Sequence, residues 1–419
     1  MKRYPEYKTS DMEWIGEIPA HWKFGKIKYI ATFVNQKLTP ETDAIKISPE
    51  NVESETGKVI DFYSSYDSVG VKFHAGDILF NKLRVYLSKV VFAEYGGYSL
   101  GEMIVIRPFL QDTSKYLFYL MLSCRFIAYC NSISYGVRMP RTDVDDILNA
   151  QIPTPSYQEQ IQIANFLDRK TEQIDELIRI KERRIELLQE QRTTLINQTV
   201  TKGLDPNVEM KPSGVEWIGE IPVHWKVINT KYLFQLVTEP APKNNDCELL
   251  SIYTDIGVRP RKELEERGNR ATTTDGYWLV KKGDFIVNKL LAWMGAVGLS
   301  NYEGVTSPAY DILRKIRPLN ERFYEYLFRC GLYFTEFKKW SRGIMEVRLR
   351  LYFDQLGQIP LVFPPVNEQD KIVNFLDCKT GQVDELISAE HQKIELLKEY
   401  RQSLISEAVT GKIDVRNEV

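Results

Sequence analysis

EWIGEIPAHWK, the stretch at residues 13–23, returns as EWIGEIPVHWK at residues 216–226, with one substitution in eleven positions. Two shorter stretches also recur, NFLD at 165–168 and 374–377 and IELL at 185–188 and 394–397, whereas the sequence between them mostly differs. A repeat of roughly 200 residues is too long for a solenoid unit and has the size of a domain with an appended element. We therefore predict two related modules, built for two related but non-identical targets.

Composition fits two ordinary domains. The chain has 419 residues, of which 43% are hydrophobic and 27% charged, enough for two full cores. No apolar run approaches the about 18 residues that a bilayer span needs, and the first residues lack the apolar core of a signal peptide. We expect a cytoplasmic protein without a membrane contact. Its five scattered cysteines predict free thiols rather than disulfides or a zinc site.

Charge is distributed unevenly along the chain, although the net charge is only −2. By residue count, the segments 1–155 and 211–365 have net charges of 0 and +4, whereas 156–210 and 366–419 have −2 and −4. Acidic segments are poor candidates for contact with phosphate. The charge pattern therefore favours the two longer segments as binding regions.

The difference in residue number between matching positions of the two copies shows which parts of each copy vary in length. It is 203 at the Trp-Ile-Gly motif, 207 at Gly76 and Gly283, and 209 through both tails. Insertions and deletions thus fall within the first part of each copy, and the tails match without a gap. We predict globular domains at 1–155 and 211–365, and spacer helices at 156–210 and 366–419.

Each tail is predicted to form one long helix. Ser156 and Asn367 are expected as N-caps, and Gly203 and Gly411 suit the helix ends. Positions spaced alternately three and four apart form a heptad seam that is interrupted twice by polar residues in each copy. The apolar residues expected at the interface are Ile178, Ile185, Leu188, Leu195, Ile387, Ile394, Leu397 and Leu404.

The seam favours an antiparallel coiled coil between the two helices over packing of each helix on a sheet, because the opposite faces are densely charged. Duplicated domains are usually related by a pseudo-two-fold axis, which would place one globular domain at each end of the pair. Ser156 to Thr201 is 46 residues, so an unbroken helix of this length measures about 69 Å. The globular parts read as mixed α/β, with strands at 76–80, 103–108 and 283–287 and buried helices at 115–129 and 323–340.

Catalytic motifs are missing from the sequence. There is no phosphate-binding Gly-x-x-x-x-Gly-Lys-Ser/Thr loop and no Gly-x-Gly-x-x-Gly turn. None of the four histidines is paired with another at metal-ligand spacing. His21 and His224, each between a proline and a tryptophan, are expected to be packing or capping groups. We identify no catalytic residue, metal site or cofactor site in this chain.

Residues suited to binding DNA occur in two places in each copy. After the repeated Gly-Asp strand both copies continue Asn-Lys-Leu, with candidates Asn81, Lys82, Arg84, Asn288 and Lys289. Lys and Arg bind phosphate or guanine and Asn pairs with adenine, although a solvated charged turn explains this loop equally well.

A second basic stretch precedes each tail, at residues 135–141 and 342–350. Glycine followed by two or three arginines, with few acids between them, favours phosphate or base contacts over a solvated loop. The candidates in these stretches are Arg138, Arg141, Arg342, Arg348 and Arg350.

The duplicated Trp-Ile-Gly-Glu-Ile-Pro-x-His-Trp motif, the Gly-Asp strand, the Ile-Pro boundaries at 152–153 and 359–360 and a Glu-Gln-containing helix resemble the DNA specificity subunit of type I restriction-modification systems. The resemblance covers the whole length. It implies two target recognition domains, related by a pseudo-two-fold axis and separated by two long helices that form an antiparallel coiled coil. Each recognition domain would read one half of a bipartite site in double-stranded DNA, and the helices would set the gap between the halves.

The resemblance also implies partners. A non-catalytic specificity subunit docks two modification (methyltransferase) subunits, which carry S-adenosylmethionine and flip out the target adenine. Restriction subunits add an ATP-dependent nuclease, so S-adenosylmethionine, ATP and Mg are expected on partner subunits.

Two other hypotheses remain open. A coiled-coil scaffold or adapter without DNA specificity would show no salt-dependent DNA binding as an assembled complex. A self-contained nuclease or methyltransferase would be active as the purified chain.

Overall fold

The structure is a computed structural model, and it describes residues 2–10, 12–41, 43–62, 69–263, 274–343 and 349–418. Its contacts divide the chain into two compact units, Met1–Glu182 with Glu390–Val419, and Arg183–Ala389. The units differ from the segments expected from sequence, because each unit contains one globular domain together with parts of both long helices.

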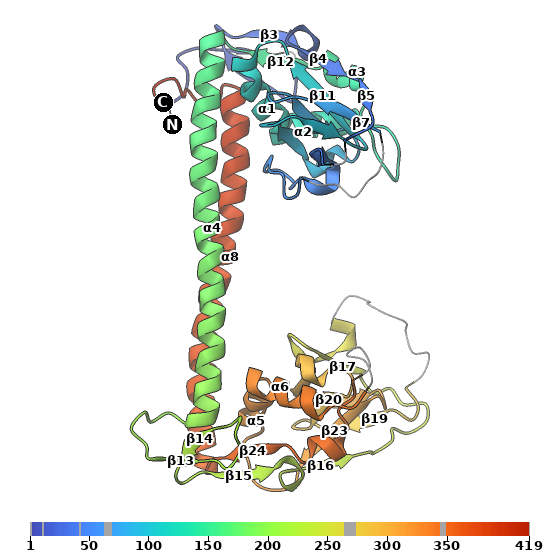
Figure 1. The fold of residues 1–419 in the computed structure, drawn as a ribbon, viewed down its shortest axis with the longest axis vertical. Coiled ribbons are helices and arrows are strands. Elements are labelled where there is room, and N and C mark those ends of the chain that lie inside the picture. The colour runs from blue at the N-terminus through green and yellow to red at the C-terminus, as the bar shows by residue number, and fades with distance from the viewer. Residues whose placement is uncertain are drawn as a thin grey trace. The chain divides into compact units, whose positions relative to one another are not determined.

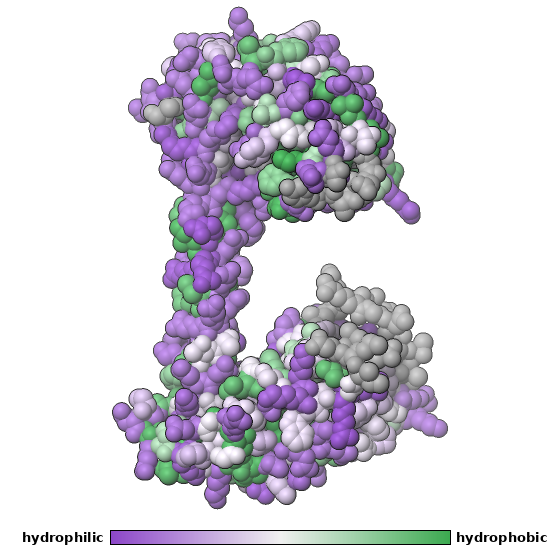
Figure 2. Space-filling view, viewed as in Figure 1, coloured by the Kyte–Doolittle hydropathy of each residue, from purple (hydrophilic) through white to green (hydrophobic). Residues whose placement is uncertain are grey.

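The two tails form helices α4 (Tyr157–Lys202) and α8 (Val366–Val409), which lie side by side (Figure 1). Within the first unit, Asp175 of α4 contacts Arg401 of α8, and Lys181 contacts Glu390. Residue numbers therefore rise along α4 as they fall along α8. The predicted antiparallel coiled coil is confirmed, and the visible outer face of the pair is mainly hydrophilic (Figure 2).

The structure agrees with one of the two predicted N-caps and differs from the other. The Ser156 hydroxyl accepts a hydrogen bond from the Glu159 N–H at 3.4 Å, as expected of an N-cap. The prediction for Asn367 is wrong, because α8 begins one residue earlier and the Pro365 carbonyl accepts the N–H groups of the first turn. After α8, Gly411 adopts a φ of +71°, and a Cβ there would lie 3.0 Å from the Trp22 ring. Only glycine fits this left-handed, crowded position without strain.

The described residues of the first domain form two four-stranded sheets, two two-stranded pairs and three α-helices. A central antiparallel sheet has the order β4-β11-β8-β9, a second sheet has the order β5-β7-β10-β6, and β1 pairs with β2 and β3 with β12. The strands are β1 (Tyr7–Thr9), β2 (Glu17–Pro19), β3 (Lys23–Lys26), β4 (Ala31–Val34), β5 (Lys37–Leu38), β6 (Lys46–Ile47), β7 (Gly70–Phe73), β8 (Ile78–Asn81), β9 (Val90–Phe92), β10 (Gly97–Ser99), β11 (Met103–Pro108) and β12 (Gln151–Thr154). The helices are α1 (Ser114–Leu122), α2 (Cys124–Ser132) and α3 (Val144–Asn149).

The second domain repeats the frame of the first. Its central sheet β16-β23-β20-β21 and its pairs β13-β14 and β15-β24 follow the same order, whereas β17-β18 and β19-β22 form two separate pairs. The strands are β13 (Met210–Pro212), β14 (Glu220–Pro222), β15 (Lys226–Asn229), β16 (Phe234–Val237), β17 (Leu250–Tyr253), β18 (Gly257–Pro260), β19 (Trp278–Val280), β20 (Phe285–Asn288), β21 (Val297–Leu299), β22 (Gly304–Thr306), β23 (Tyr310–Lys315) and β24 (Pro360–Phe363). The helices are α5 (Glu321–Phe328), α6 (Gly331–Trp340) and α7 (Phe353–Leu356). The predicted mixed α/β class is confirmed.

The central sheet of each domain is buried on both faces. In β8, Ile78 and Phe80 face the core formed with α1 and α2, and Leu79 faces a smaller core shared with the second sheet. Successive side chains of a strand point to opposite faces, so this strand reads as a continuous apolar run. In β20, Phe285 and Ile286 are likewise divided between two cores.

The duplicated motif positions the start of each long helix. Trp22 and Trp225 are fully buried in their domain cores. His21 Nε2 lies 3.1 Å from a carboxylate oxygen of Glu159, and His224 Nε2 lies 2.7 Å from the carboxylate of Glu368. Both glutamates belong to the first turn of a helix, where a negative charge is favourable. The motif therefore fastens each domain to the beginning of its helix, which explains why the two copies retained it.

Candidate nucleic-acid interface

In the first domain, the two basic stretches expected from sequence lie against each other. Leu83 and Arg141 form an isolated antiparallel bridge. The Arg84 N–H donates to the Pro140 carbonyl at 2.7 Å, and the Thr142 N–H donates to the Lys82 carbonyl at 3.0 Å. These hydrogen bonds make residues 81–84 and 135–142 one continuous surface, named here the first basic surface.

The outer part of this surface is a hairpin. Tyr135 and Arg141 exchange two backbone hydrogen bonds of 2.9 Å, and Gly136 turns the chain with a φ of +97°. Between these residues Val137 is fully exposed, and Arg138 is also exposed. An ordered loop that presents bare apolar and cationic side chains is suited to contact with another molecule.

The charges of the first basic surface are only partly neutralised. Glu102 lies 3.6 Å from Lys82 and 2.5 Å from Arg141, so that one carboxylate serves two cations. Arg138 remains exposed, and the Nε of Arg84 is buried without a hydrogen-bond partner among the described residues. The surface therefore has an excess of positive charge, as contact with phosphate requires.

The second domain builds the same arrangement, named here the second basic surface (residues 288–290, 342–343 and 349–352). Arg342 and Arg350 exchange two backbone hydrogen bonds of 2.9 Å, and the Leu351 N–H donates to the Lys289 carbonyl at 2.8 Å. Both arginine side chains are exposed. Arg348 lies outside the residues that the structure describes.

Lys289 is held beside a buried acid. Its Nζ lies 3.2 Å from Asp311 Oδ1 and donates to the Pro308 carbonyl at 3.1 Å. Burial raises the pKa of Asp311, and the neighbouring Lys289 ammonium opposes that rise. Lys289 is thus partly committed to its own domain, which leaves Arg342 and Arg350 as the more accessible cations.

The structure corrects the expectation for the two asparagines. Asn81 and Asn288 are only 4% and 8% exposed. The Asn81 amide donates to the Leu83 carbonyl at 2.8 Å, and the Asn288 side-chain oxygen accepts the Leu290 N–H at 3.0 Å. Their side chains shape the turn instead of facing a base. An asparagine two residues before a backbone N–H is a frequent turn former, and the identical Asn-Lys-Leu spacing carried that signal.

The residues expected at the coiled-coil interface are all at least partly buried. Ile185, Ile394 and Leu404 are buried. The other expected residues are partly buried, namely Ile178, Leu188, Leu195, Ile387 and Leu397.

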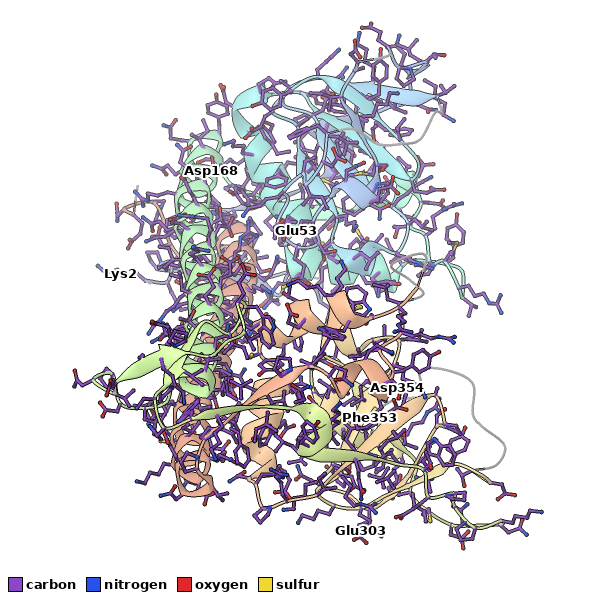
Figure 3. The ribbon with its side chains drawn as sticks, turned by 60° about the horizontal axis from the view of Figure 1, so that its bottom comes forward. Lys2, Glu53, Asp168, Glu303, Phe353 and Asp354 are labelled. Atoms are coloured by element: carbon purple, nitrogen blue, oxygen red, sulfur yellow. The ribbon has the colours of Figure 1, made fainter. Side chains whose placement is uncertain are left out.

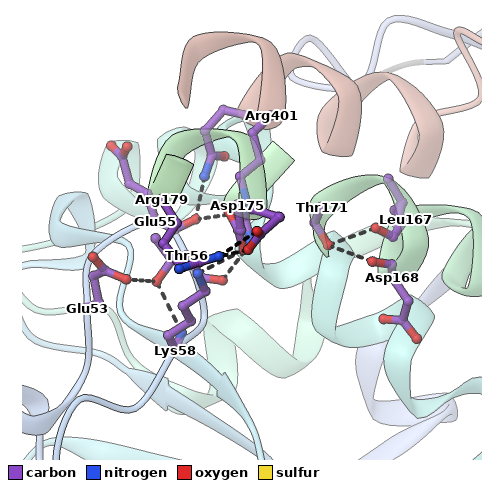
Figure 4. Close-up of polar contacts among 12 residues, drawn as sticks. Glu53, Glu55, Thr56, Lys58, Leu167, Asp168, Thr171, Asp175, Arg179 and Arg401 are labelled. Atoms are coloured by element: carbon purple, nitrogen blue, oxygen red, sulfur yellow. Dashed lines mark hydrogen bonds and ion pairs between the residues drawn. The ribbon is translucent and has the colours of Figure 1, made fainter. Parts of the chain in front are cut away.

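One polar seam residue has a contact that the sequence did not indicate. Arg401 is 5% exposed, and its Nε lies 3.1 Å from Asp175 Oδ1. Its other two nitrogens donate to the carbonyls of Glu55 at 3.1 Å and Thr56 at 2.9 Å (Figure 4). Arg401 therefore attaches a loop of the first domain to the helical pair. The only signal in the sequence was that the seam arginine and the aspartate occur in both copies.

A cleft of about 1670 Å³ lies in the first unit between this loop, β9, α1 and the two long helices. Figure 3 labels Glu53 and Asp168, which contribute to its wall from the loop and from α4. Nine carboxylates and six basic side chains line it. The acidic excess among these lining residues disfavours phosphate.

Among the residues that the structure describes, no group of three or more His, Cys, Asp and Glu side chains could hold a metal ion. Within the same residues, every helix is too short or too polar to cross a membrane.

Comparison with known proteins gives a consistent result. A family model described as the type I restriction modification DNA specificity domain matches residues 19–189. The specificity subunit of the type I restriction enzyme EcoDI from Escherichia coli is 26% identical over 157 residues, which cover 36% of this chain and 35% of that protein. The match thus spans about a third of the Escherichia coli relative.

A second relative matches most of the chain. The MjaVIII specificity subunit of Methanocaldococcus jannaschii is 23% identical over 367 residues, which cover 82% of this chain and 78% of the relative.

Two solved structures share the fold. One, described as "Structural basis underlying complex assembly and conformational transition of the type I R-M system", has a TM-score of 0.69 at 18% identity and covers 94% of this chain and 99% of its own. The HsdS subunit from Thermoanaerobacter tengcongensis has a TM-score of 0.53 at 17% identity and covers 94% and 98%. The family model over residues 19–189 and the two relatives thus show that this chain is similar to type I restriction-modification DNA specificity subunits, and the solved structures share its fold.

Proposed function

We propose that this chain recognises a bipartite sequence in double-stranded DNA, with the first domain reading one half and the second domain reading the other. The observation that carries the proposal is the repeated basic surface. In both domains the loop after the Gly-Asp strand is hydrogen-bonded to a bridged pair of segments that carries arginine, although the sequences of these segments differ. A constant frame with variable arginine-bearing segments suits two readers of different sequences.

The chemistry of the two basic surfaces fits a duplex. Arg138, Arg342 and Arg350 are exposed, and an arginine can bind guanine through two hydrogen bonds in the major groove or neutralise a phosphate. Lys82 and Arg141 are held by Glu102, Lys289 is held by Asp311, and the Nε of Arg84 is buried. We assign Arg138, Arg342 and Arg350 to DNA contact, and Lys82, Arg84, Arg141 and Lys289 to the base of each surface.

The coiled coil is proposed to set the gap between the two half-sites and to dock two modification subunits. Restriction subunits would complete the complex. S-adenosylmethionine, ATP and Mg would be bound by these partners, and this chain would contribute recognition without catalysis. The names of the relatives support this division, because each is the specificity subunit of a restriction enzyme. The family match also favours DNA recognition over a scaffold without DNA specificity.

Single-molecule methylome sequencing of the host tests the proposal directly. We expect one adenine-methylated motif made of two defined half-sites and an unspecific gap, which disappears when the gene for this chain is deleted. A motif that persists after the deletion, or a single uninterrupted motif that depends on the chain, would contradict the proposal.

A further inference from the structure

Lys181 and Glu390 occupy the same position in the two copies, 209 residues apart, and they meet each other in the coiled coil. Lys181 Nζ lies 2.9 Å from Glu390 Oε2, with the glutamate side chain 2% exposed and the lysine side chain 23% exposed. In an antiparallel pair of matching helices, a residue can face the corresponding residue of the other copy only where the pseudo-two-fold axis passes through the pair. Opposite charges at this point are therefore a property of the pairing between α4 and α8.

The neighbouring ion pair has a different character. Asp175 pairs with Arg401, and the repeat offset makes Asp384 and Arg192 their counterparts, which pair with each other in the second unit at 3.1 Å. Each copy thus carries both the acid and the base. The same pair would form if a helix associated with another copy of itself, so it carries no information about the partner.

The apolar seam does not select a partner either. Residues 171–192 and 380–401 are identical at 12 of 22 positions. The identical positions include the seam residues 178, 185 and 188 and their counterparts 387, 394 and 397. Hydrophobic packing alone would therefore accept α4 against α4 nearly as well as α4 against α8.

Position 181/390 distinguishes these arrangements by charge. Two α4 helices would bring Lys181 against a second Lys181, and two α8 helices would bring Glu390 against a second Glu390. Like charges at close range in a partly desolvated seam are strongly unfavourable. The penalty is larger for α4, because in α8 Lys393 also lies 3.1 Å from Glu390 and would reduce the repulsion.

We propose that the Lys181–Glu390 pair is a partner-selection device, which makes α4 pair with α8 and rejects pairing of α4 with the α4 of a second copy of this chain. Polar residues in the seam of a coiled coil are a common means of fixing partner and register. The device keeps one copy of each domain in every particle, and it acts whatever the domains bind.

The test is a transplant within the full-length chain. In the first chimera, residues 380–401 carry the sequence of residues 171–192, which places a lysine at position 390. The second chimera is identical but retains Glu390. Helix unfolding is followed by circular dichroism during heating.

We expect the second chimera to melt close to the natural chain and the first to melt about 2 to 4 °C lower, the shift that a loss of about 1 kcal/mol causes in a unit of roughly 200 residues. Equal melting temperatures of the two chimeras would overturn the proposal.

Two matched sets of variants keep the test decisive if a chimera fails to fold. In the natural chain Glu390→Lys should lower the melting temperature, and the added Lys181→Glu should restore most of it. In a further variant, positions 181 and 390 are both leucine. There the other α4 substitutions in residues 380–401 should lower the melting temperature no more than they do in the second chimera, which retains Glu390. Failure of the double charge reversal to restore stability would also contradict the proposal.

Discussion

The guanidinium of Arg107 donates two hydrogen bonds, of 2.8 and 2.6 Å, to the fully buried carboxylate of Asp77. The pair joins β11 to the turn that begins β8, and it raises the pKa of Arg107. We predict that Asp77→Ala destabilises the first domain by about 3 kcal/mol, the lower end for breaking a buried ion pair, because Arg107 keeps partial access to water. Hydrogen exchange at β8 and β11 measures the loss. Asp284→Ala, which breaks the equivalent pair with Arg314, should affect the second domain alone, and unchanged exchange at β8 in the Asp77 variant would refute the assignment.

Arg401 should control the mobility of the loop at residues 53–58. Arg401→Met retains length and apolar packing but removes the hydrogen bonds to the Glu55 and Thr56 carbonyls. We expect amide exchange in residues 53–58 to rise several-fold. Arg192→Met, at the corresponding position of the other copy, is the matched control and should leave this loop unaffected. If both variants have the same effect, the loop is not held by Arg401.

The coiled coil should lose stability in acid through Glu390. Hydrogen bonds from Lys181 and Lys393 lower the pKa of this glutamate from 4.5 to about 2. A lowered pKa in the folded state means that its contribution is complete above pH 4.5 and is lost as the pH falls toward 2. In urea titrations followed by circular dichroism, Glu390→Gln should therefore be less stable than the natural chain at pH 6, and the difference should shrink between pH 4.5 and 2. The exposed Glu399, changed to Gln, serves as the control, and a constant difference across this range would contradict the assignment.

The arginines of the two hairpins should act on separate half-sites. We predict that Arg138→Ala weakens or relaxes only the half-site read by the first domain, and Arg350→Ala only the other. The cost is about 1 to 3 kcal/mol where the contact is bidentate to guanine. Binding of the assembled methyltransferase complex to DNA with one half-site altered at a time provides the measurement. An equal loss at both half-sites for either variant would rule out a division of labour.

The frame of this protein was predictable from the sequence because its signals are local and occur twice. The heptad spacing, the Gly-Asp turns and the aromatic helices each depend on residues close together in the chain. The antiparallel direction followed from the duplication, and the contacts of Asp175 and Lys181 confirm it.

For the candidate site, the sequence predicted which residues take part but not how they are arranged. The sequence indicated two basic stretches in each copy, but their contact depends on a bridge between Leu83 and Arg141, residues 58 positions apart. The sequence also did not show which polar residues are buried. A polar residue such as Asn81 is expected to be exposed, but its side-chain amide donates a hydrogen bond to the Leu83 carbonyl within the turn. The attachment of Arg401 to the first domain involves carbonyls 345 and 346 residues away, and backbone acceptors leave no trace in side-chain patterns.

The length of the helical pair offers the most direct measurement of the proposed function. One heptad inserted after Glu182 and one inserted before Glu390 lie at the same level of the pair and preserve the Lys181–Glu390 contact. Seven residues add about 10 Å of helix, or about three base pairs. Insertions at Leu188 and Leu397 are the matched control, because they shift Lys181 away from Glu390 and should destabilise the pair.

Methylome sequencing of cells that carry the first insertion variant then reports the site. We predict that both half-sites stay unchanged and that the gap between them lengthens by about three base pairs. Altered half-sites with an unchanged gap would contradict the assignment of reading to the domains and spacing to the helices.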